Sequence, residues 1–446
     1  MACDLTKGKE SKVIFKFTAP MFISVLFQQM YSIADSLIAG RFAGVDALAA
    51  VGASFPITNI FNAIAVGCNI GCGVVIAQYF GGRKYEKVKT TVSTSIISAI
   101  VLGALLTVFG IVFTPAVMSA IDTPQNIFND SALYMKIYVA GFIFLFIYNI
   151  SNGIFNALGD SKMSLYFLIF SSVFNVILDY VLVARFNMGV MGVAWATFIA
   201  QGIAGILSTV TLIYNIKKLP TTQRPELFSF KELKRIGSFS VPSILQQSFV
   251  SVGNVFVQRL INSFGSATVA GFSAAMKLNL FAINILATFG NGVSSFTAQN
   301  VGAKRYDRLK KGMKYGNLMA FSTGVAVAIV YVAFATPLLE LFMDESGGAE
   351  AIKAGVMFLT IVSPFFSVIP IKLVCDGYLR GIGYMKLFMV ATFTDLILRV
   401  ILAYILSPIW GFKGIVCAWP VGWCAAMVLS VIFYKHSSKK ILKENK

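Results

Sequence analysis

Histidine is almost missing from this sequence, and charged residues are scarce. The chain of 446 residues has one histidine, His436, in a basic tail, so neither a histidine proton relay nor a histidine-rich metal site is expected. Only 13% of the residues are charged, against about 25% in an ordinary soluble domain. With 57% hydrophobic residues and a mean hydropathy of +0.78, the composition excludes a soluble globular protein and is typical of an integral membrane protein.

The motifs of enzymes and cofactor proteins are also missing. The six cysteines form no Cys-x-x-Cys pair; Cys68 and Cys72 lie one helical turn apart and are read as small packing residues. No Walker-type phosphate loop occurs, and the glycine-rich stretch 67–73 lies within an apolar run, where glycine favours close helix packing. We therefore expect no enzymatic activity and no cofactor.

Acidic residues are half as frequent as basic ones, which gives a net charge of +18. The basic residues collect in alternate loops: 7–16, 83–89, 217–235, 304–314 and 435–446. The loops between them carry acids such as Asp122, Asp130 and Glu340. By the positive-inside rule, the basic loops and both termini are predicted to be cytoplasmic. The charge thus indicates membrane topology and contact with the lipid bilayer, and no nucleic-acid partner is expected.

Twelve apolar runs are each long enough to cross about 30 Å of hydrocarbon as a helix. They are 13–39, 51–80, 90–117, 133–156, 163–184, 190–215, 238–262, 269–299, 315–339, 352–378, 385–407 and 412–434. The first run leads directly into further membrane segments, so it is read as a retained span and not as a cleaved signal peptide.

The second half of the chain repeats the first. "QYFGGRKYEKVK" (78–89) returns in the second half as "QNVGAKRYDRLK" (299–310). "TAPMFISVLFQQ" (18–29) parallels "SVPSILQQSFVS" (240–251), which places Pro20 opposite Pro242. "NGIFNALG" (152–159) likewise aligns with "DGYLRGIG" (376–383). Six helices followed by six equivalent helices predict two bundles related by an axis along the membrane normal.

The expected fold is therefore an all-α integral membrane protein of twelve transmembrane helices. They form two pseudo-symmetric six-helix lobes around a central cavity. We expect an N-lobe at 1–215, a cytoplasmic linker at 216–237 and a C-lobe at 238–446.

Four acidic residues lie clearly inside the predicted spans: Asp35, Asp179, Asp376 and Asp395. The last two have a basic residue four positions away, Lys372 and Arg399, with which each could pair along one helix face. Asp35 and Asp179 have no basic neighbour of this kind. Because a charge in hydrocarbon costs roughly 2.5–3.5 kcal/mol on insertion scales, these two carboxylates favour a proton or cation site.

Polar residues at helical spacing accompany these acids. The stripes are Gln28, Ser32 and Asp35; Asn59, Asn62 and Asn69; Ser171, Asn175 and Asp179; and Thr197 and Gln201. The alternative interpretation is a set of interhelical hydrogen bonds, each worth about 0.6 kcal/mol. That interpretation accounts for the amides and hydroxyls taken singly, but not for two unpaired carboxylates.

At these positions the chain resembles the multidrug and toxic compound extrusion (MATE) family over nearly its whole length. Prokaryotic members have an Asp on helix one, fifteen residues after a Pro, an Asn and an Asp one turn apart on helix five, and a Thr on helix six. Here those residues are Pro20, Asp35, Asn175, Asp179 and Thr197. The resemblance implies that the last four bind the coupling ion, H⁺ or Na⁺, and that Pro20 is the kink through which helix one bends.

The resemblance also implies a function. We expect a secondary active multidrug exporter that antiports lipophilic, often cationic drugs against inward H⁺ or Na⁺ by alternating access of the two lobes. It would work as a monomer in the bacterial cytoplasmic membrane. The residues expected to contact substrate or line the cavity are Gln28, Ser32, Asn59, Gln201, Gln247, Asn254, Lys277 and Asp376.

One departure and one alternative remain at this point. The sodium-linked branch of the family is implied to use carboxylates on helices seven and ten, but helix seven has no acid here. A second-lobe sodium site is therefore not expected. A lipid or lipid-linked oligosaccharide flippase of the same superfamily would also have two repeated bundles, with cations such as Lys277, Lys372 and Arg399 holding a pyrophosphate.

Overall fold

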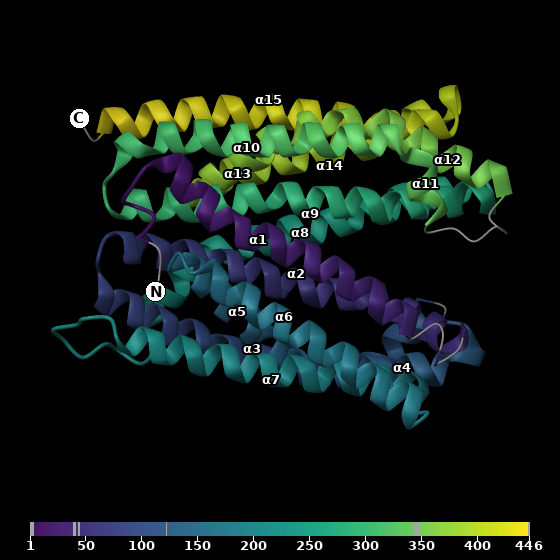
Figure 1. Cartoon of the computed structure of the whole chain (residues 1–446), viewed down its shortest axis with the longest axis horizontal. Helices are drawn as coiled ribbons and strands as arrows, with labels where there is room; N and C mark the ends of the chain where they lie inside the picture. The colour runs from purple at the N-terminus through teal and green to yellow at the C-terminus, as the bar shows by residue number, and fades with distance from the viewer. Residues whose placement is uncertain (1–3, 39–41, 43–44, 122, 342–347, 445–446) are drawn as a thin grey trace. The chain divides into compact units, whose positions relative to one another are not determined.

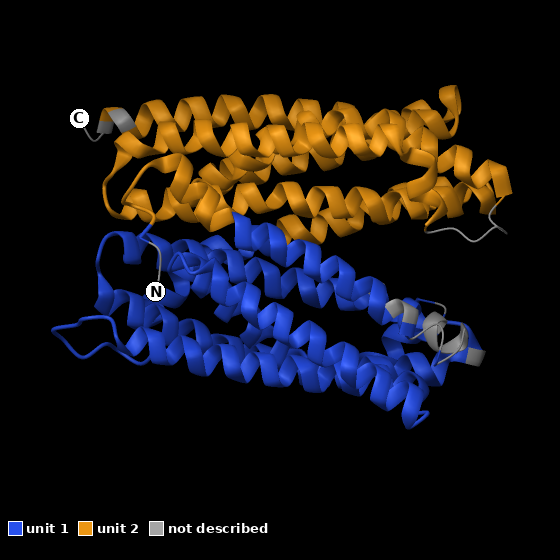
Figure 2. Cartoon of the chain, in the orientation of Figure 1, with its two compact units in different colours: residues 1–4, 19–244 blue, residues 5–18, 245–446 orange. Residues whose placement is uncertain are grey.

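The fold is a bundle of long helices. A computed structural model describes residues 4–38, 42, 45–121, 123–341 and 348–444, and within these ranges all regular secondary structure is helical, without strands (Figure 1). The chain forms two compact units (Figure 2). Unit 1 comprises Met1–Asp4 and Ala19–Ile244, and unit 2 comprises Leu5–Thr18 and Leu245–Lys446.

Unit 1 contains most of the first half of the sequence. Its elements are the second part of α1 (Glu10–Ile38), α2 (Val45–Gly81), α3 (Tyr85–Ala120), α4 (Gln125–Ala140), α5 (Phe142–Ala157), α6 (Ser161–Asp179), η2 (Tyr180–Arg185), α7 (Gly189–Lys217) and the first part of α8 (Phe230–Asn262). Helix α5 packs against α2, α3 and α7, and α6 packs against α7. Element η2 is a π-helical continuation of α6 that begins directly after Asp179.

Unit 2 contains the equivalent helices. Its elements are the first part of α1, the rest of α8, α9 (Ser266–Gly302), α10 (Tyr306–Ala333), α11 (Ala335–Glu340), α12 (Gly348–Val362), η4 (Ser363–Ser367), α13 (Ile369–Ile382), α14 (Met385–Trp410) and α15 (Phe412–Glu444). Helix α13 packs against α9 and α15, and α14 lies along α15. Buried aromatic residues, among them Phe272, Phe358 and Trp419, fill the core of this unit.

The predicted twelve-span fold is confirmed. Ten of the described helices are long and apolar enough to cross a membrane, and α4 with α5 forms an eleventh, bent span. The remaining long helix, α8, corresponds to the predicted span 238–262 and has a more polar sequence that carries Glu232, Arg235 and Gln247.

Three predicted spans are broken where the sequence analysis expected single helices. One of them, 315–339, passes from α10 to α11 at Phe334. The span 133–156 is two helices, α4 and α5, bent by 47°. At the break, a Cβ on Gly141 would lie 3.0 Å from the Phe198 ring, so glycine allows this close approach. The span 352–378 is α12, the 3₁₀ turn η4 and α13; Pro364 and Pro370 begin the second and third pieces because proline cannot donate a helical hydrogen bond.

The loop that connects the two sequence repeats is hydrogen-bonded to unit 1. Along it, Thr222 N donates to Glu86 Oε1 and Ser229 N donates to Thr94 Oγ1, each at 3.1 Å. Lys89 Nζ also donates to Thr221 Oγ1 at 3.1 Å. These bonds hold the segment predicted as a linker, 216–237, along the first turns of α3.

The division into units differs from the lobe boundaries expected from the repeat. The units change inside α1, between Thr18 and Ala19, and inside α8, between Ile244 and Leu245. The predicted linker 216–237 therefore lies wholly in unit 1. Its predicted location on the cytoplasmic side stays a prediction.

Candidate functional site

Asp35 and Asp179 meet inside unit 1. Asp35 lies in the last turns of α1, half-buried, and Asp179 is the final residue of α6, with 1% of its surface exposed. The two carboxyl groups are close enough to interact directly. Asn175, one turn before Asp179 on the same face of α6, is equally buried. The structure thus brings together three of the four residues predicted for ion coupling.

The polar atoms of this cluster are not satisfied. Asp35 Oδ1, both carboxylate oxygens of Asp179 and both amide atoms of Asn175 are buried without a well-formed hydrogen bond. In the described part of the chain, neither carboxylate has a Lys or Arg partner. Buried polar groups normally find partners, because an unpaired one costs several kcal/mol of desolvation. The cluster therefore has buried carboxylate and amide atoms that no other described side chain satisfies.

A polar cavity lies beside the acidic pair. Its volume is about 330 Å³, and it is lined by Gln28, Tyr31, Asn62, Val66, Leu145, Tyr148, Asn149, Leu168, Ser171, Ser172, Asn175, Thr197, Ala200 and Gln201. Amides and hydroxyls alternate with apolar groups, and no Lys or Arg is among them. Asn175 links the two features, since it borders both the cavity and Asp179. We call this space the unit 1 cavity.

Tyrosines surround the acids, and sequence reasoning missed them. Tyr31 and Tyr134 each lie within electrostatic range of both carboxyl groups. Tyr138, one turn after Tyr134 on α4, accepts a hydrogen bond from Asn62 Nδ2 at 3.2 Å. In an apolar run such residues look like ordinary core. The one available signal is their spacing of four, which places two phenol groups on one helix face.

The arrangement suits a small, hard cation or a proton. The available donors are the oxygens of two carboxylates and the amide of Asn175, and oxygen ligands suit hard cations. Thr197 lines the neighbouring cavity on α7. A proton on one carboxyl group would turn an acceptor into a donor toward the other. Within the described residues no group of three or more His, Cys, Asp and Glu side chains could hold a resident metal.

The remaining predicted cavity residues are scattered. Gln28 and Gln201 line the unit 1 cavity, whereas Asn59 is not in its lining. Ser32 lies on α1 and is exposed. Four others belong to unit 2, so their part in a central cavity stays a prediction: Gln247, Asn254, Lys277 and Asp376.

In unit 2 the acids are neutralised, as the spacing indicated. Lys372 Nζ lies 2.8 Å from Asp376 Oδ2, and Ser430 Oγ donates to Asp376 Oδ1 at 2.7 Å. Arg399 Nη2 donates to Asp395 Oδ2, also at 2.8 Å. The predicted pairs along one helix face are therefore confirmed.

Two repeated six-helix units of membrane-spanning helices, with buried unpaired carboxylates beside a polar cavity, define a multi-pass membrane transporter. The chain belongs to the MATE family: the MatE family model matches residues 20–181 and 242–405, more than half of the sequence. The two matches begin at the repeat-related residues Pro20 and Pro242.

Bacterial relatives carry transporter names. The chain is 30% identical over 342 residues to the "Probable multidrug resistance protein YoeA" of Bacillus subtilis, covering 74% of this chain and 73% of that one. It is 26% identical to the "Probable multidrug resistance protein YpnP" of the same species over 99% and 98% of the two chains. A "FAD transporter" of Shewanella oneidensis is 23% identical over 92% and 91%.

Solved structures share the fold. A MOP superfamily transporter from Pyrococcus furiosus matches with a TM-score of 0.92 at 23% identity, covering 98% of both chains. A multidrug resistance MATE family transporter, solved in an outward-facing conformation, matches with a TM-score of 0.92 at 23% identity over 99% of both.

Proposed function

We propose that this protein is a secondary active exporter that antiports lipophilic, often cationic small molecules against an inward flow of H⁺ or Na⁺. The observation that carries the proposal is the pair of buried carboxylates, Asp35 and Asp179, without a cationic partner in the described chain. The names of the YoeA and YpnP relatives support drug-like substrates.

Ion entry and substrate export are coupled because the ion and a cationic substrate compete for the negative charge of the two carboxylates. The ionised pair attracts a cation, and it is costly to keep both carboxylates charged in a site withdrawn from water. Binding of a proton or sodium ion removes part of this charge, which weakens the attraction for a cationic substrate and favours its release. The oxygen donors of Asn175 and Thr197 would complete the ion site.

The available energy is sufficient for export without ATP. One elementary charge moving down ~150 mV carries about 3.5 kcal/mol. This free energy supports roughly a 300-fold gradient of an uncharged substrate. Exchange of one ion for one monovalent cation moves no net charge, so export of such a substrate draws on the concentration gradient of the ion or on a second ion. Pro20 removes one hydrogen bond of α1, so the helix can bend at low cost as access alternates.

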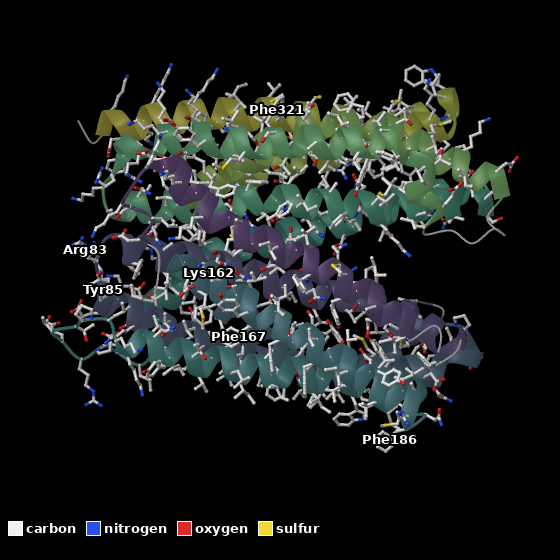
Figure 3. All side chains as sticks on the ribbon, in the orientation of Figure 1. Arg83, Tyr85, Lys162, Phe167, Phe186 and Phe321 are labelled. Atoms are coloured by element: carbon white, nitrogen blue, oxygen red, sulfur yellow. The ribbon has the colours of Figure 1, made fainter. Side chains whose placement is uncertain are left out.

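The proposed topology has both termini and the basic loops in the cytoplasm, in the cell membrane of a bacterium. Within unit 1, Arg83 and Tyr85 lie at one end of the bundle and Phe186 lies at the other (Figure 3). The basic loop 82–84 therefore marks the cytoplasmic end of this unit. We propose that the protein acts as a monomer.

Export of an anionic dinucleotide is the less favoured alternative, raised by the FAD transporter relative. A diphosphate needs cationic donors, and the lining of the unit 1 cavity has none. The discriminating experiment uses purified protein in liposomes, with pH and sodium gradients imposed separately. Ethidium efflux driven by either gradient supports the proposal, whereas flavin dinucleotide efflux or lipid flipping without ethidium efflux contradicts it.

A further inference from the structure

The linker 216–237 carries large apolar side chains that the described part of the chain leaves uncovered. Leu227 is 75% exposed and Phe230 is 79% exposed, and both lie outside the twelve predicted spans. The ring of Phe228 packs against Phe230 edge to face, with 5.0 Å between the ring centres. Exposed apolar residues gathered in one place mark a surface that meets another molecule or a membrane. We call Leu227, Phe228 and Phe230 the linker patch.

Hydrogen bonds tie the linker to α3 at two levels. Thr222 N donates to Glu86 Oε1 in the first turn of α3, and Ser229 N donates to Thr94 Oγ1, each at 3.1 Å. Thr94 follows Glu86 by about 12 Å along the helix, at 1.5 Å per residue. The linker therefore runs along the outside of α3 toward the middle of unit 1, and the linker patch lies at its deeper end.

This deeper end is level with the lipid headgroups. As a helix, the apolar run 90–117 is about 42 Å long, which is the thickness of a bilayer with its headgroups. Thr94 lies about 6 Å inside the start of this run, whereas Glu86 lies about 6 Å outside it. Ser93 Oγ donates to the Glu226 carbonyl at 3.4 Å, which holds the residue before Leu227 at the same depth.

The surface of α3 changes at the same place. No residue of this fully described helix is exposed between Lys87 and Ile100. From there on apolar side chains face outward, with Ile100 42% exposed and Val101 55% exposed. The lipid-facing surface thus begins about 9 Å beyond Thr94. The linker patch lies between this surface and the water.

The end of α7 combines an aromatic ring and a base at this level. Tyr214 is 61% exposed, and Lys218 Nζ lies 3.8 Å from the centre of its ring. Lys89 Nζ donates to the Lys217 carbonyl at 3.4 Å, which places the end of α7 beside the start of the apolar run of α3. Tyrosine and lysine are typical of the membrane interface, because each joins an apolar body to a polar tip.

The charges around the linker patch are mostly positive. In the linker, one exposed acid, Glu226, stands against five exposed bases: Lys217, Lys218, Arg224, Lys231 and Lys234. The other linker acid, Glu232, is buried and accepts a hydrogen bond from the Tyr79 hydroxyl at 2.8 Å. Basic residues beside apolar ones at a membrane surface attract anionic lipid.

We propose that the linker is a membrane anchor for unit 1, in which Leu227 and Phe230 enter the lipid while Lys231 and Lys234 bind anionic headgroups. The partner is the leaflet at the end of unit 1 that carries Arg83 (Figure 3). A protein partner or a second copy of the chain could cover an apolar patch in water, but the depth and the positive charge fit a lipid surface. The anchor requires only that unit 1 spans a bilayer, and it is independent of the proposed transport.

Fluorescence quenching by lipids tests the anchor. An NBD fluorophore is attached at Leu227→Cys in a protein whose native cysteines are replaced, and the protein is reconstituted in vesicles. We expect lipids with a nitroxide on the acyl chain near the headgroup to quench it strongly. The matched control carries the label at Gln223→Cys, an exposed residue that follows Thr222 at the level of Glu86, and should be quenched little.

Two outcomes would overturn the anchor. Absence of quenching at Leu227→Cys would mean that water or another protein chain covers the linker patch. Equal quenching at Leu227→Cys and Gln223→Cys would contradict the difference in depth between the two ends of the linker. Neither result bears on transport, because the measurement needs no gradient and no substrate.

The preference for anionic lipid is tested in phosphatidylcholine vesicles that contain a minor fraction of nitroxide lipid, either phosphatidylglycerol or phosphatidylcholine. At Leu227→Cys, the phosphatidylglycerol form should quench about twofold more than the phosphatidylcholine form, because bases gather anionic lipid around the label. Adding Lys231→Gln with Lys234→Gln should remove this excess and leave the quenching by phosphatidylcholine. Equal quenching by the two lipids in the protein with both lysines would contradict the binding of anionic headgroups.

Discussion

The unit 1 cavity and the matching region of unit 2 are formed by equivalent helices of the two repeats, but their side chains differ. In unit 1 these side chains line a cavity, and in unit 2 they fill the space. The stretch "GVMGVAWA" (189–196) aligns with "GFKGIVCA" (411–418), and this register places Thr197 opposite Trp419 and Gln201 opposite Trp423. The first member of each pair lines the unit 1 cavity. The second is a buried tryptophan, packed against the Phe358 ring in one case and the Phe366 ring in the other.

The charges differ in the same place. Tyr148 and Asn175 border the unit 1 cavity, and their counterparts in the second repeat are Lys372 and Arg399. Both counterparts are held in ion pairs, and the Arg399 guanidinium also lies 5.2 Å from the Trp419 ring centre. Equivalent helices thus differ in the volume and charge of their side chains. Unit 1 has a cavity beside unpaired carboxylates, and unit 2 has a packed core in which the charged residues form ion pairs.

The largest expected effect is on coupling in unit 1. Asp35→Asn and Asp179→Asn should each abolish gradient-driven efflux, because an amide cannot take up a proton or supply the charge that binds a cation. Expression should stay near normal, since a neutral amide is easier to bury than a carboxylate. The measurement is efflux from liposomes under an imposed gradient.

The matched control is the double variant Lys372→Gln with Asp376→Asn, which removes a pair without leaving a buried charge. It should keep most of the transport activity. Reversed sensitivity, with full activity in Asp35→Asn and loss in the double variant, would assign coupling to unit 2.

The next largest effect is expected when a residue of one unit is replaced by the residue at the equivalent position of the other. Thr197→Trp should fill the unit 1 cavity and lower efflux by roughly tenfold or more, whereas Thr197→Ser should be mild. Trp419→Thr should destabilise the protein by about 3–5 kcal/mol, because it leaves a void in the aromatic core. Thermal unfolding in detergent measures stability. Equal efflux in Thr197→Trp and wild type would mean that substrate does not use this cavity.

A smaller, purely structural effect tests the ion pairs of unit 2. Lys372→Gln leaves Asp376 charged and unpaired, which should cost roughly 3–5 kcal/mol, whereas adding Asp376→Asn should recover most of this loss. The readout is again thermal unfolding. If single and double variants are equally stable, the pair is not what holds these helices.

The smallest expected effect is on stability, at a loop position whose backbone conformation is the same in both units. Arg83 and Lys304, which the repeat aligns, both have left-handed backbones, with φ of 54° and 57°. Glycine relieves this strain but adds freedom to the unfolded chain, so Arg83→Gly and Lys304→Gly should each change stability by less than about 1 kcal/mol. Arg83→Val should destabilise, because a β-branched residue is poorly tolerated there. A marked difference between the two glycine variants would show that the loops are not equivalent.

Hydrophobic runs and the repeat predicted most of this fold. Twelve spans and two bundles follow from the sequence alone, since apolar runs of about twenty residues fit helices that satisfy their own backbone hydrogen bonds in hydrocarbon. The bend at Gly141 and the change of unit inside α1 and inside α8 could not be predicted in this way. Both depend on which surfaces meet in three dimensions, and nothing in the local pattern of α1 or α8 indicates the unit in which each half packs.

The candidate site was predicted in part. Asp35 and Asp179 stood out because lone carboxylates in membrane spans are expensive, and helical spacing added Asn175. Tyr31 and Tyr134 gave no such signal, because a tyrosine in an apolar run costs little and looks like packing. The filling of unit 2 by Trp419 and Trp423 becomes visible only when the two repeats are compared residue by residue.

The change of unit inside α1 and α8 has a consequence for cutting the chain. Each unit contains residues from both sequence repeats, because Leu5–Thr18 lies in unit 2 and residues 230–244 lie in unit 1. Within unit 2, Leu5 is hydrogen-bonded to Gln299 and Asn300, and within unit 1, Arg235 donates to Gln78. Neither repeat expressed alone would therefore hold all the residues of one unit, whereas the two halves expressed together would.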